Sequence, residues 1–329
     1  MNPTALLELC KGRKIYIQTH NFPDPDAIGS AFGLQKLLEH FGIASTLCHE
    51  GQIDKLSAIK LLQMCHIEMH PYDEIVDDMK EEDMIILVDC QKNNGNTTDF
   101  IGDEMAAIDH HPTFVEVEYQ YSDLRITGAC CSIIADYYRT LEVEPTVEVA
   151  TALLYGLRMD TFQFSRGVTS FDIEMFGYLF RYSDKNLLTA LETNNLEFSD
   201  LKAYGASIDT IQIYGKVGFS TIDFYCPDGL VASLSDFILS LAEVEVAIVY
   251  SLRKNGYKFS VRSERDDVHA GNLTHDAISE YGNGGGHATM AGGFVPKEVM
   301  DELGPNTMAN VRKLFIEVLE KECPQALEQ

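Results

Sequence analysis

The sequence lacks several features that would assign it to a particular class of protein. Its 329 residues contain no apolar run long enough to span a bilayer, no C-x-x-C pair, and no basic start followed by an apolar core. No G-x-G-x-x-G follows the first predicted strand, which argues against a Rossmann-type dehydrogenase. These absences predict a reduced, cytoplasmic protein with no membrane partner.

Basic residues are also scarce. Lys and Arg number 25 against 51 acidic residues, which gives a formal net charge of -26. Such a chain repels polyanions, so long duplex nucleic acid and anionic membranes are excluded as partners. A small phosphorylated ligand remains compatible, because bound divalent cations reverse the local potential of an acidic cleft.

The remaining composition is that of a globular protein. Hydrophobic residues make up 45% of the chain and charged residues 23%, which is too apolar for extended disorder. The eight cysteines are scattered, which indicates free thiols in place of disulfides or a zinc site. The length predicts two domains, and the sequence leaves the oligomeric state open, with a homodimer as one candidate.

Strands and helices alternate in the first half of the chain. β-rich runs cover residues 14–19, 84–88 and 105–108, and helical periodicity covers 27–41, 129–140, 147–159 and 171–180. This alternation predicts an α/β fold with a parallel sheet, whose ligand crevice lies beyond the carboxyl ends of the strands.

The second half has a different pattern. A continuous helical stretch over residues 183–213 predicts a connector, and strands follow at 218–225, 244–253 and 257–262, with a hairpin turn at 254–256. A glycine run at 281–287 precedes a predicted helix start, a strand at 292–295 and a final helix at 306–321. We place the catalytic domain at 1–187, the helical linker at 188–213 and the second domain at 214–329.

The loop after the first predicted strand gathers metal-binding groups. It reads His20-x-x-x-Asp24-x-Asp26, and Pro23 and Pro25 restrict φ on either side of Asp24. Carboxylate oxygens with imidazole suit Mn²⁺, Mg²⁺ or Fe²⁺ better than structural zinc. The alternative is that Asp24 or Asp26 merely caps the following helix.

Further acidic residues lie at the ends of other elements. Asp89 ends an apolar strand, where an Asp is also a common turn former. Asp160 closes a helical run, and a helix C-terminus disfavours negative charge. A bound cation would offset that cost, so both residues are candidate ligands.

Asp109-His110-His111 follows another strand. Adjacent side chains in extended backbone point in opposite directions, so we expect only one of the two histidines to ligate a metal. The other could reach a substrate phosphate while Asp109 fixes an imidazole tautomer. Two solvent-facing histidines are the alternative.

Taken together, these motifs resemble one family. The pattern H-x-x-x-D-x-D-x-x-G-S, a strand-end Asp, D-H-H, a later D-T, an R-S strand end and GGGH is similar to the DHH phosphoesterases that carry a DHHA1 second domain. The resemblance covers nearly the whole chain in the same order. It implies a parallel-sheet DHH domain joined by a helical connector to a smaller α/β DHHA1 domain with a mixed sheet.

The family resemblance implies a centre of two divalent cations that activates a water molecule. One ion would be held by His20, Asp24 and Asp160, the other by Asp26 and His110, with Asp89 bridging them. Mn²⁺ is the expected metal, with Mg²⁺ or Fe²⁺ as alternatives. Catalytic roles fall to Asp89, Asp109 and His111.

The implied substrate-binding residues belong to the second domain. They are Arg262, Ser263, Gly284, Gly285, Gly286 and His287, of which the arginine suits a terminal phosphate and the glycine amides could form an anion nest. A flexible turn is the alternative reading of the glycines. Two departures from the family pattern are Asn283, where a further glycine is usual, and Phe162, where a small residue is common.

The size of the chain favours one branch of the family. We expect a phosphoesterase that hydrolyses very short oligonucleotides, linear dinucleotides or 3'-phosphoadenosine 5'-phosphate. A cyclic-dinucleotide phosphodiesterase is the second candidate, and a nucleotide-binding regulator with an inert metal site is the third. A pyrophosphatase or polyphosphatase is disfavoured, because that branch lacks GGGH.

Overall fold

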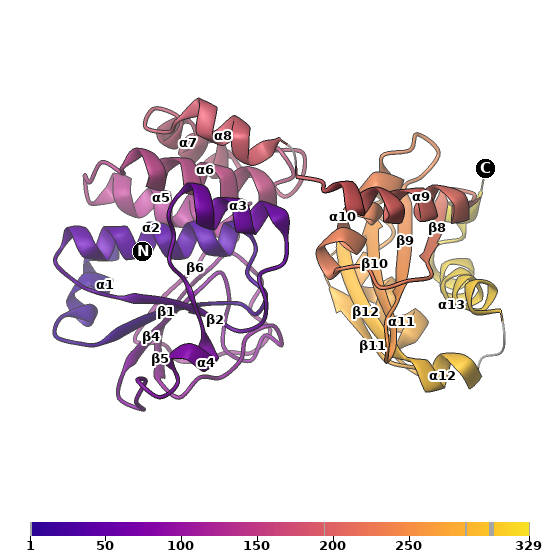
Figure 1. Cartoon of the computed structure of the whole chain (residues 1–329), viewed down its shortest axis with the longest axis horizontal. Helices are drawn as coiled ribbons and strands as arrows, with labels where there is room; N and C mark the ends of the chain where they lie inside the picture. The colour runs from indigo at the N-terminus through magenta and orange to yellow at the C-terminus, as the bar shows by residue number, and fades with distance from the viewer. Residues whose placement is uncertain (1, 194, 287, 303–305, 329) are drawn as a thin grey trace. The chain divides into compact units, whose positions relative to one another are not determined.

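The computed structural model describes residues 2–193, 195–286, 288–302 and 306–328. The chain forms two compact units, Met1–Asn195 and Leu196–Gln329, which are coloured from indigo to yellow along the chain in Figure 1. In the described ranges no helix is long and apolar enough to cross a membrane.

The first unit is built on a six-stranded sheet in the order β3-β2-β1-β4-β5-β6. Every neighbouring pair in this sheet is parallel, which confirms the predicted fold class. Its strands are β1 (Ile15–Thr19), β2 (Thr46–His49), β3 (His70–Pro71), β4 (Met84–Val88), β5 (Asp103–Asp109) and β6 (Tyr121–Leu124).

Helices lie on both faces of this sheet. Helices α2, α5 and α6 cover one face, and the short α4 lies on the other (Figure 1). The helices of this unit are α1 (Pro3–Cys10), α2 (Pro25–His40), α3 (Leu56–Met64), α4 (Tyr72–Ile75), α5 (Cys130–Thr140), α6 (Val147–Asp160), α7 (Ser170–Leu179) and α8 (Lys185–Glu192).

The sequence of strand β4 explains why both faces of the sheet are covered by other elements. Met84, Ile86 and Val88 point into the core beneath α2, whereas Ile85 and Leu87 point into a second apolar cluster on the opposite face. All five are fully buried. A strand that is apolar on both faces is stable only between two layers, so the run M-I-I-L-V selects a central position in a parallel sheet.

Helices α2 and α6 pass each other at very short range because glycines face the contact. A Cβ at Gly29 would lie 2.8 Å from the carbonyl oxygen of Ala152, and one at Gly156 would lie 2.8 Å from that of Pro25. The absence of these side chains lets the start of α2 approach the last turns of α6. This close approach brings the two helix ends that carry Asp26 and Asp160 together.

The second unit contains a mixed six-stranded sheet in the order β11-β12-β10-β9-β8-β7, in which only β8 and β9 pair in parallel. The mixed sheet confirms the prediction. Its strands are β7 (Gln212–Tyr214), β8 (Val217–Ile222), β9 (Val246–Leu252), β10 (Gly256–Ser263), β11 (Asn283–Gly286) and β12 (Met290–Pro296).

Helices also cover both faces of the second sheet. Helices α9 (Leu201–Thr210) and α10 (Asp228–Leu239) pack on one face, and α11 (Ala270–Ile278) and α13 (Thr307–Glu322) pack on the other. Helix α12 (Lys297–Glu302) follows β12, and 3-10 turns occupy Phe198–Asp200 and Pro324–Leu327.

Two local predictions are wrong. The stretch 183–213 is not one helix, because α8 ends at Glu192 and the next helical turn begins at Phe198. Helix α8 belongs to the first unit and α9 to the second, so the predicted linker is divided between them. The glycine run is followed by strand β12 where a helix start was expected.

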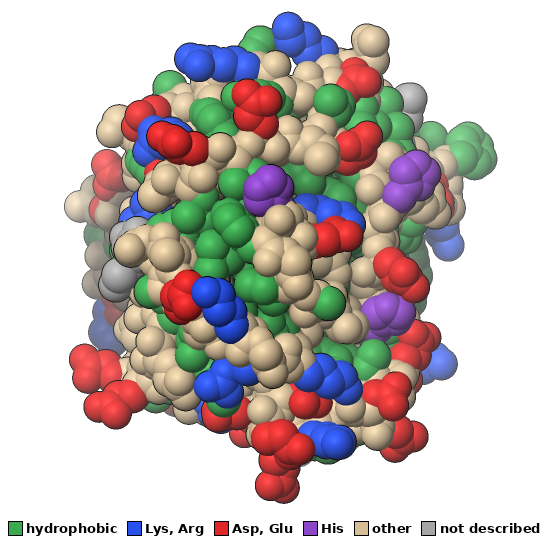
Figure 2. All heavy atoms as spheres, turned by 90° about the vertical axis from the view of Figure 1, so that its left-hand side faces the viewer, with side chains coloured by type: hydrophobic (Ala, Val, Ile, Leu, Met, Phe, Trp, Pro, Cys, Tyr) green, Lys and Arg blue, Asp and Glu red, His purple; other side chains and the backbone are tan. Residues whose placement is uncertain are grey.

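Charged side chains are distributed over the surface. On the face shown in Figure 2, acidic side chains in red lie among basic side chains in blue and hydrophobic ones in green. This face therefore shows no extended basic patch.

Candidate metal centre

The candidate site lies at the carboxyl ends of three neighbouring strands. Strands β1, β4 and β5 are adjacent and parallel, and His20, Asp89 and His110 each follow the last residue of one of them. Their common direction brings residues far apart in the sequence to one edge of the sheet, as expected for this fold class.

A first group of donors consists of His20, Asp24 and Asp89, whose ligand atoms all lie within 4.8 Å of one another. Nε2 of His20 lies 3.6 Å from Oδ2 of Asp89 and 3.9 Å from Oδ1 of Asp24. Nδ1 of His20 contacts the carbonyl oxygen of Asn21 at 2.9 Å, which fixes the ring with Nε2 toward the carboxylates.

A second group consists of Asp26, His110 and Asp160. Nε2 of His110 lies 3.4 Å from Oδ2 of Asp160 and 3.8 Å from Oδ2 of Asp26. Its Nδ1 contacts the carbonyl oxygen of Thr127 at 3.0 Å, so this imidazole is oriented in the same manner as His20. The resemblance placed Asp160 with His20 and Asp24, whereas its carboxylate is grouped with Asp26 and His110 here.

Asp89 lies between these groups. Its Oδ1 is 3.3 Å from Nε2 of His110 and 3.7 Å from Nδ1 of His111. The residue has φ of 59°, a backbone conformation that few residues other than glycine adopt but that Asn, Asp and His adopt more often than most. This backbone turns the carboxylate back over the sheet edge toward both sets of donors.

His110 and His111 point to the same side, which corrects the expectation that they diverge. Their ring centroids are 4.2 Å apart. Strand β5 ends at Asp109, so the alternation of an extended backbone no longer applies to the two histidines. Both rings are therefore available on the side where Asp89 lies.

Asp109 contacts both histidines of the motif. It is fully buried, and its Oδ1 accepts from the amide of His110 and contacts Nδ1 of His111, both at 2.8 Å. Burial raises the pKa of Asp109, but hydrogen bonds from His111 and Gln91 lower it below its ordinary value. The contact between this carboxylate and Nδ1 of His111 fixes the orientation of the His111 ring.

Gln91 is a site residue that the sequence did not reveal. Its Nε2 donates to Oδ2 of Asp109 at 2.7 Å and to the carbonyl oxygen of His111 at 3.1 Å, and its Oε1 accepts from Thr113 at 2.7 Å. The side chain is 1% exposed. Its position two residues after Asp89, in the loop that leaves β4, is the only signal that could have indicated it.

The capping alternative for the first loop is also correct, and it does not exclude ligation. Oδ1 of Asp24 accepts from the amides of Asp26 and Ala27 and caps α2. The two carboxylate oxygens of Asp26 accept from the amides of Cys130 and Cys131 at the start of α5. A carboxylate oxygen has two acceptor positions, so each group retains capacity for a cation.

Two buried polar atoms in the centre of the site lack hydrogen bonds. Among the described residues, neither Oδ1 of Asp89 nor Nε2 of His110 has a hydrogen-bond partner. A buried polar atom without a partner costs about 1–3 kcal/mol. These atoms face other donors of the same site, which is the arrangement that a metal ion would satisfy.

The crowding of buried acidic groups also shifts the pKa values of the site. Burial, reinforced by the charges of Asp89 and Asp160, raises the pKa of Asp26 well above its usual value. Burial and the charges of Asp24 and Asp89 raise that of Asp160 to about 6. Burial lowers the pKa of His20, but Asp24 and Asp89 raise it to about 9. Burial and the neighbouring negative charges thus favour the protonated forms of Asp26 and Asp160, and bound cations would oppose this shift of the pKa.

The donor set fits divalent cations. Four carboxylates and two imidazoles converge, and four negative charges balance two dications. Oxygen with imidazole nitrogen suits Mn²⁺, Mg²⁺ or Fe²⁺. Three cysteines near the site, Cys90, Cys130 and Cys131, are buried and direct their thiols at the carbonyl oxygens of Gln18, Ile108 and Asp26, respectively. They therefore form no thiolate site for zinc.

The predicted substrate-binding residues of the second unit have a different environment from the one expected. Arg262 is 7% exposed, and its Nε donates to Asp236 at 2.7 Å. Ser263 is 2% exposed and contacts the backbone of Arg265. Gly284, Gly285 and Gly286 form edge strand β11 paired with β12, which corrects the prediction of an anion nest at a helix N-terminus. His287 lies outside the described residues.

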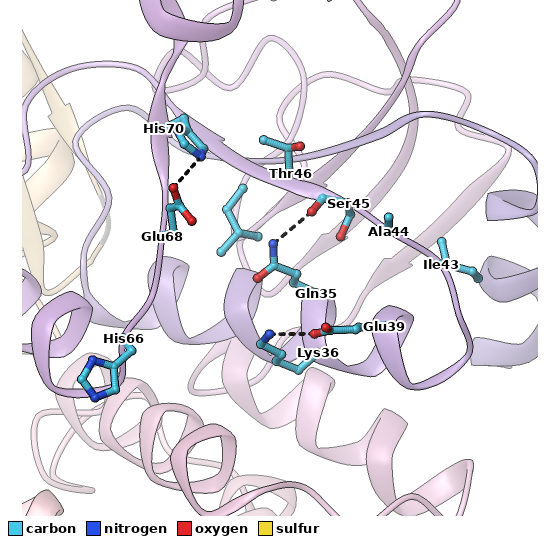
Figure 3. A pocket seen from close by; sticks show the side chains of 11 residues that line it. Gln35, Lys36, Glu39, Ile43, Ala44, Ser45, Thr46, His66, Glu68 and His70 are labelled. Carbon is cyan, nitrogen blue, oxygen red and sulfur yellow. Dashed lines mark hydrogen bonds and ion pairs between the residues drawn. The ribbon is translucent and has the colours of Figure 1, made fainter.

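A separate hollow of about 420 Å³ lies beside α2 and β2, and Figure 3 shows the side chains that line it. None of the predicted site residues contributes to it. The only lysine among the described residues that line it, Lys36, lies 2.6 Å from Glu39, and the imidazole of His70 lies 3.7 Å from Glu68. The hollow therefore has no unbalanced positive charge for an anionic ligand.

Comparison with family models agrees with the division into two units. Residues 14–157 match the model described as "DHH family, N-terminal domain", and residues 214–321 match the "DHHA1 domain". The first match includes all the donors described above except Asp160.

Individual relatives are distant. The chain is 25% identical over 288 residues to an uncharacterised protein of Methanocaldococcus jannaschii, covering 87% of this chain and 59% of the relative. It is 25% identical over 312 residues to the bifunctional oligoribonuclease and PAP phosphatase NrnA of Thermus thermophilus, covering 91% and 89%. An exopolyphosphatase-related protein of Bacteroides fragilis shares the fold, with a TM-score of 0.78, 20% identity and coverage of 98% and 96%.

Proposed function

Because the chain belongs to the DHH family and carries a DHHA1 domain, we propose that it is a metal-dependent phosphoric ester hydrolase acting on small nucleotide substrates. The ester bond would be hydrolysed at the edge of the first sheet, where the donors of both groups converge. The chain spans only 59% of the length of one of its relatives, in a match that covers 87% of this chain, so its activity and its substrates are proposals.

One observation carries the proposal. Oδ1 of Asp89 and Nε2 of His110 are buried without hydrogen-bond partners among the described residues, in the middle of four carboxylates. The two atoms lie 3.3 Å from each other, which is close enough for an ion pair, but they are not aligned for a hydrogen bond. A site built only for stability would satisfy both atoms with hydrogen bonds. Without a bound cation, both atoms stay buried without a hydrogen bond. A cation ligated by both atoms would remove this energetic cost.

The proposed ligands are His20, Asp24, Asp26, Asp89, His110 and Asp160. When bound, two divalent cations supply a hydroxide at neutral pH and neutralise the phosphate. We propose Mn²⁺ as the metal, with Mg²⁺ and Fe²⁺ as alternatives that the same oxygen and imidazole donors would accept.

His111 and Asp109 are proposed to act on the substrate side. Asp109 holds Nδ1 of His111 at 2.8 Å, which sets the orientation of the imidazole next to Asp89. With Nδ1–H bonded to Asp109, the protonated form of the ring can also donate a hydrogen bond from Nε2 to a phosphoryl oxygen of the substrate. Gln91 is a positioning residue, because it contacts Asp109 and the backbone of His111 but no reacting group.

The substrate class follows from charge and from the relative of similar length. With a net charge of -26, the protein repels long polyanions but accepts short ones next to bound cations. The NrnA relative is an oligoribonuclease and PAP phosphatase. We assign short oligonucleotides, linear dinucleotides or 3'-phosphoadenosine 5'-phosphate as substrates, which the glycine strand β11 of the second unit would help to bind.

The compartment is proposed to be the reducing cytoplasm. All eight cysteines are free thiols, and seven of them are buried. Free thiols persist where glutathione and thioredoxin keep them reduced.

Initial rates on a substrate panel test the proposal. The Mn²⁺-loaded protein is incubated with two- to five-residue RNAs, 3'-phosphoadenosine 5'-phosphate and cyclic dinucleotides, with Asp89→Asn as the inactive reference. Hydrolysis of the linear or bisphosphate substrates is expected. Faster turnover of a cyclic dinucleotide would reassign the substrate, and tight nucleotide binding with no hydrolysis would indicate a regulator.

A further inference from the structure

Two exposed phenylalanines lie on the loops that carry the metal ligands. Phe22 stands between His20 and Asp24, and Phe162 follows Asp160 by two residues. Their exposed fractions are 64% and 51%. A single exposed aromatic ring is common on a protein surface. Two such rings on the loops of one polar site are candidates for contact with a ligand.

Both residues also have an unfavourable backbone conformation. Phe22 has φ of 57° and Phe162 has φ of 47°, a region in which a bulky residue is an outlier. Each such conformation destabilises the folded protein by about as much as the loss of a hydrogen bond does. Residues in such conformations cluster at ligand sites. Glycine would adopt either conformation without strain, so the aromatic rings must serve another purpose.

The Phe22 ring is held in place from one side. Its amide donates to the carbonyl oxygen of Glu50 at 2.8 Å, and its ring rests on Gly51, where a Cβ would lie 2.5 Å from Cε1 of the ring. Gly51, with φ of 81°, therefore leaves room for the ring. The result is an aromatic surface that is packed on one side and accessible on the other.

The backbone conformation around Phe162 also leaves its ring exposed. It is the first of three successive residues with positive φ, followed by Gln163 and Phe164. Phe164 turns inward and packs edge-on against Phe176, whereas Phe162 stays outside with the guanidinium of Arg166 5.3 Å from its ring centre. The strained turn thus separates one core phenylalanine from one that faces solvent beside Asp160.

We propose that Phe22 and Phe162 are specificity residues that stack on the bases of the substrate. Every base has an apolar face that stacks on an aromatic ring, so such rings select nucleotides without reading their sequence. This inference rests on the proposed function and narrows it, since it separates base-bearing phosphate esters from inorganic phosphates and sugar phosphates.

Binding and turnover are measured with matched ligands. Titration calorimetry of the Mn²⁺-loaded protein compares adenosine 5'-monophosphate with ribose 5-phosphate, which lacks only the base. Hydrolysis compares a linear diadenylate with the same dinucleotide made without bases. The variants are Phe22→Leu, Phe162→Leu and the ring-preserving Phe22→Tyr. Phe41→Leu is the control, because Phe41 is 43% exposed at the far end of α2.

We expect the leucine variants to lose affinity for base-bearing ligands only. Each leucine variant weakens binding of adenosine 5'-monophosphate and raises the KM for diadenylate by about tenfold, as expected for one lost stacking contact. Ribose 5-phosphate binding and turnover of the base-free dinucleotide change by less than about twofold, which also shows that the variant is folded and holds its metal. Phe22→Tyr and Phe41→Leu resemble the wild type.

The outcomes separate the two proposals. If the wild-type protein binds both monophosphates equally, or if the leucine variants affect base-free and base-bearing ligands alike, the stacking assignment is wrong even when hydrolysis is observed. If the wild type prefers the base-bearing monophosphate and loses that preference in the variants but hydrolyses no ester, the stacking assignment stands and the hydrolase assignment fails.

Discussion

The role of Asp89 at the centre of the site gives the sharpest test. Asp89→Asn preserves the size of the side chain and removes one negative charge from a position 3.3 Å from His110 and 3.6 Å from His20. If this carboxylate is shared by two cations, its loss weakens both. We therefore expect that Mn²⁺ no longer raises the Tm of the variant, whatever the effect of the substitution on the stability of the metal-free protein.

The size of the effect follows from linkage. Mn²⁺ at about 100 times its Kd stabilises the folded protein by about 2.7 kcal/mol. For a unit of this size, 1 kcal/mol shifts the Tm by about 2–4 °C, so the wild-type Tm rises by about 5–11 °C. Removal of a charge about 4 Å from a cation costs at least ~4 kcal/mol at an effective dielectric constant of about 20. Affinity then falls about a thousandfold, and the shift in the variant is under about 1 °C.

Calorimetric melting with and without Mn²⁺ measures this shift, and the difference cancels any effect on the metal-free protein. Asp83→Asn is the matched control, because Asp83 lies at the opposite end of β4 and pairs with the Lys80 amide and with Lys14. This control should melt slightly lower in both conditions with an unchanged Mn²⁺ shift. An Asp89→Asn protein that gains as many degrees as the wild type would refute the ligand assignment.

Three other predictions concern the support of the site, the crossing of α2 and α6, and the burial of the thiols. Gln91→Leu removes the donor to Asp109 and should lower kcat about tenfold with KM within twofold, since a lost buried partner costs about 1–3 kcal/mol; an unchanged kcat contradicts the positioning role. Gly156→Ala places a methyl group 2.8 Å from the Pro25 carbonyl oxygen and should destabilise the protein by about 1–3 kcal/mol and weaken Mn²⁺ binding. Gly177→Ala, which meets no atom within 4 Å, should be neutral or stabilising. Thiol titration of the native protein should modify Cys323 first, because the other cysteines are buried; rapid reaction of several thiols would contradict the packing.

The first unit was predictable because its sequence signals are strong and local. The run from Met84 to Val88 is apolar on both faces, and this alone requires a central strand between two layers. Donors placed directly after such strands must meet, since parallel strands end at one edge. For this reason His20, Asp89 and His110 are brought together as expected, although their roles as ligands stay a prediction.

The second unit was less predictable because its key contacts join distant segments. Arg262 was expected to contact substrate, which stays a prediction, but the hydrogen bond that its Nε donates to Asp236 on α10 was not foreseen. The glycines Gly284 to Gly286 were expected to form a loop, but pairing with β12 draws them into a strand. Neither partner can be inferred from local spacing, because β-pairing and ion pairs depend on which elements the fold makes adjacent.

The sequence by itself determined the class of the fold, the order of its elements and the chemical types of the donors, because these depend on periodicity and on residues next to strand ends. Tertiary structure alone decided that Asp160 is grouped with Asp26 and His110, that Gln91 supports Asp109, and that Phe22 rests on Gly51. Each of these contacts joins elements whose separation is set by packing, above all by the glycine-lined crossing of α2 and α6. Packing distances of this kind are a property of the assembled core, which no single stretch of sequence contains.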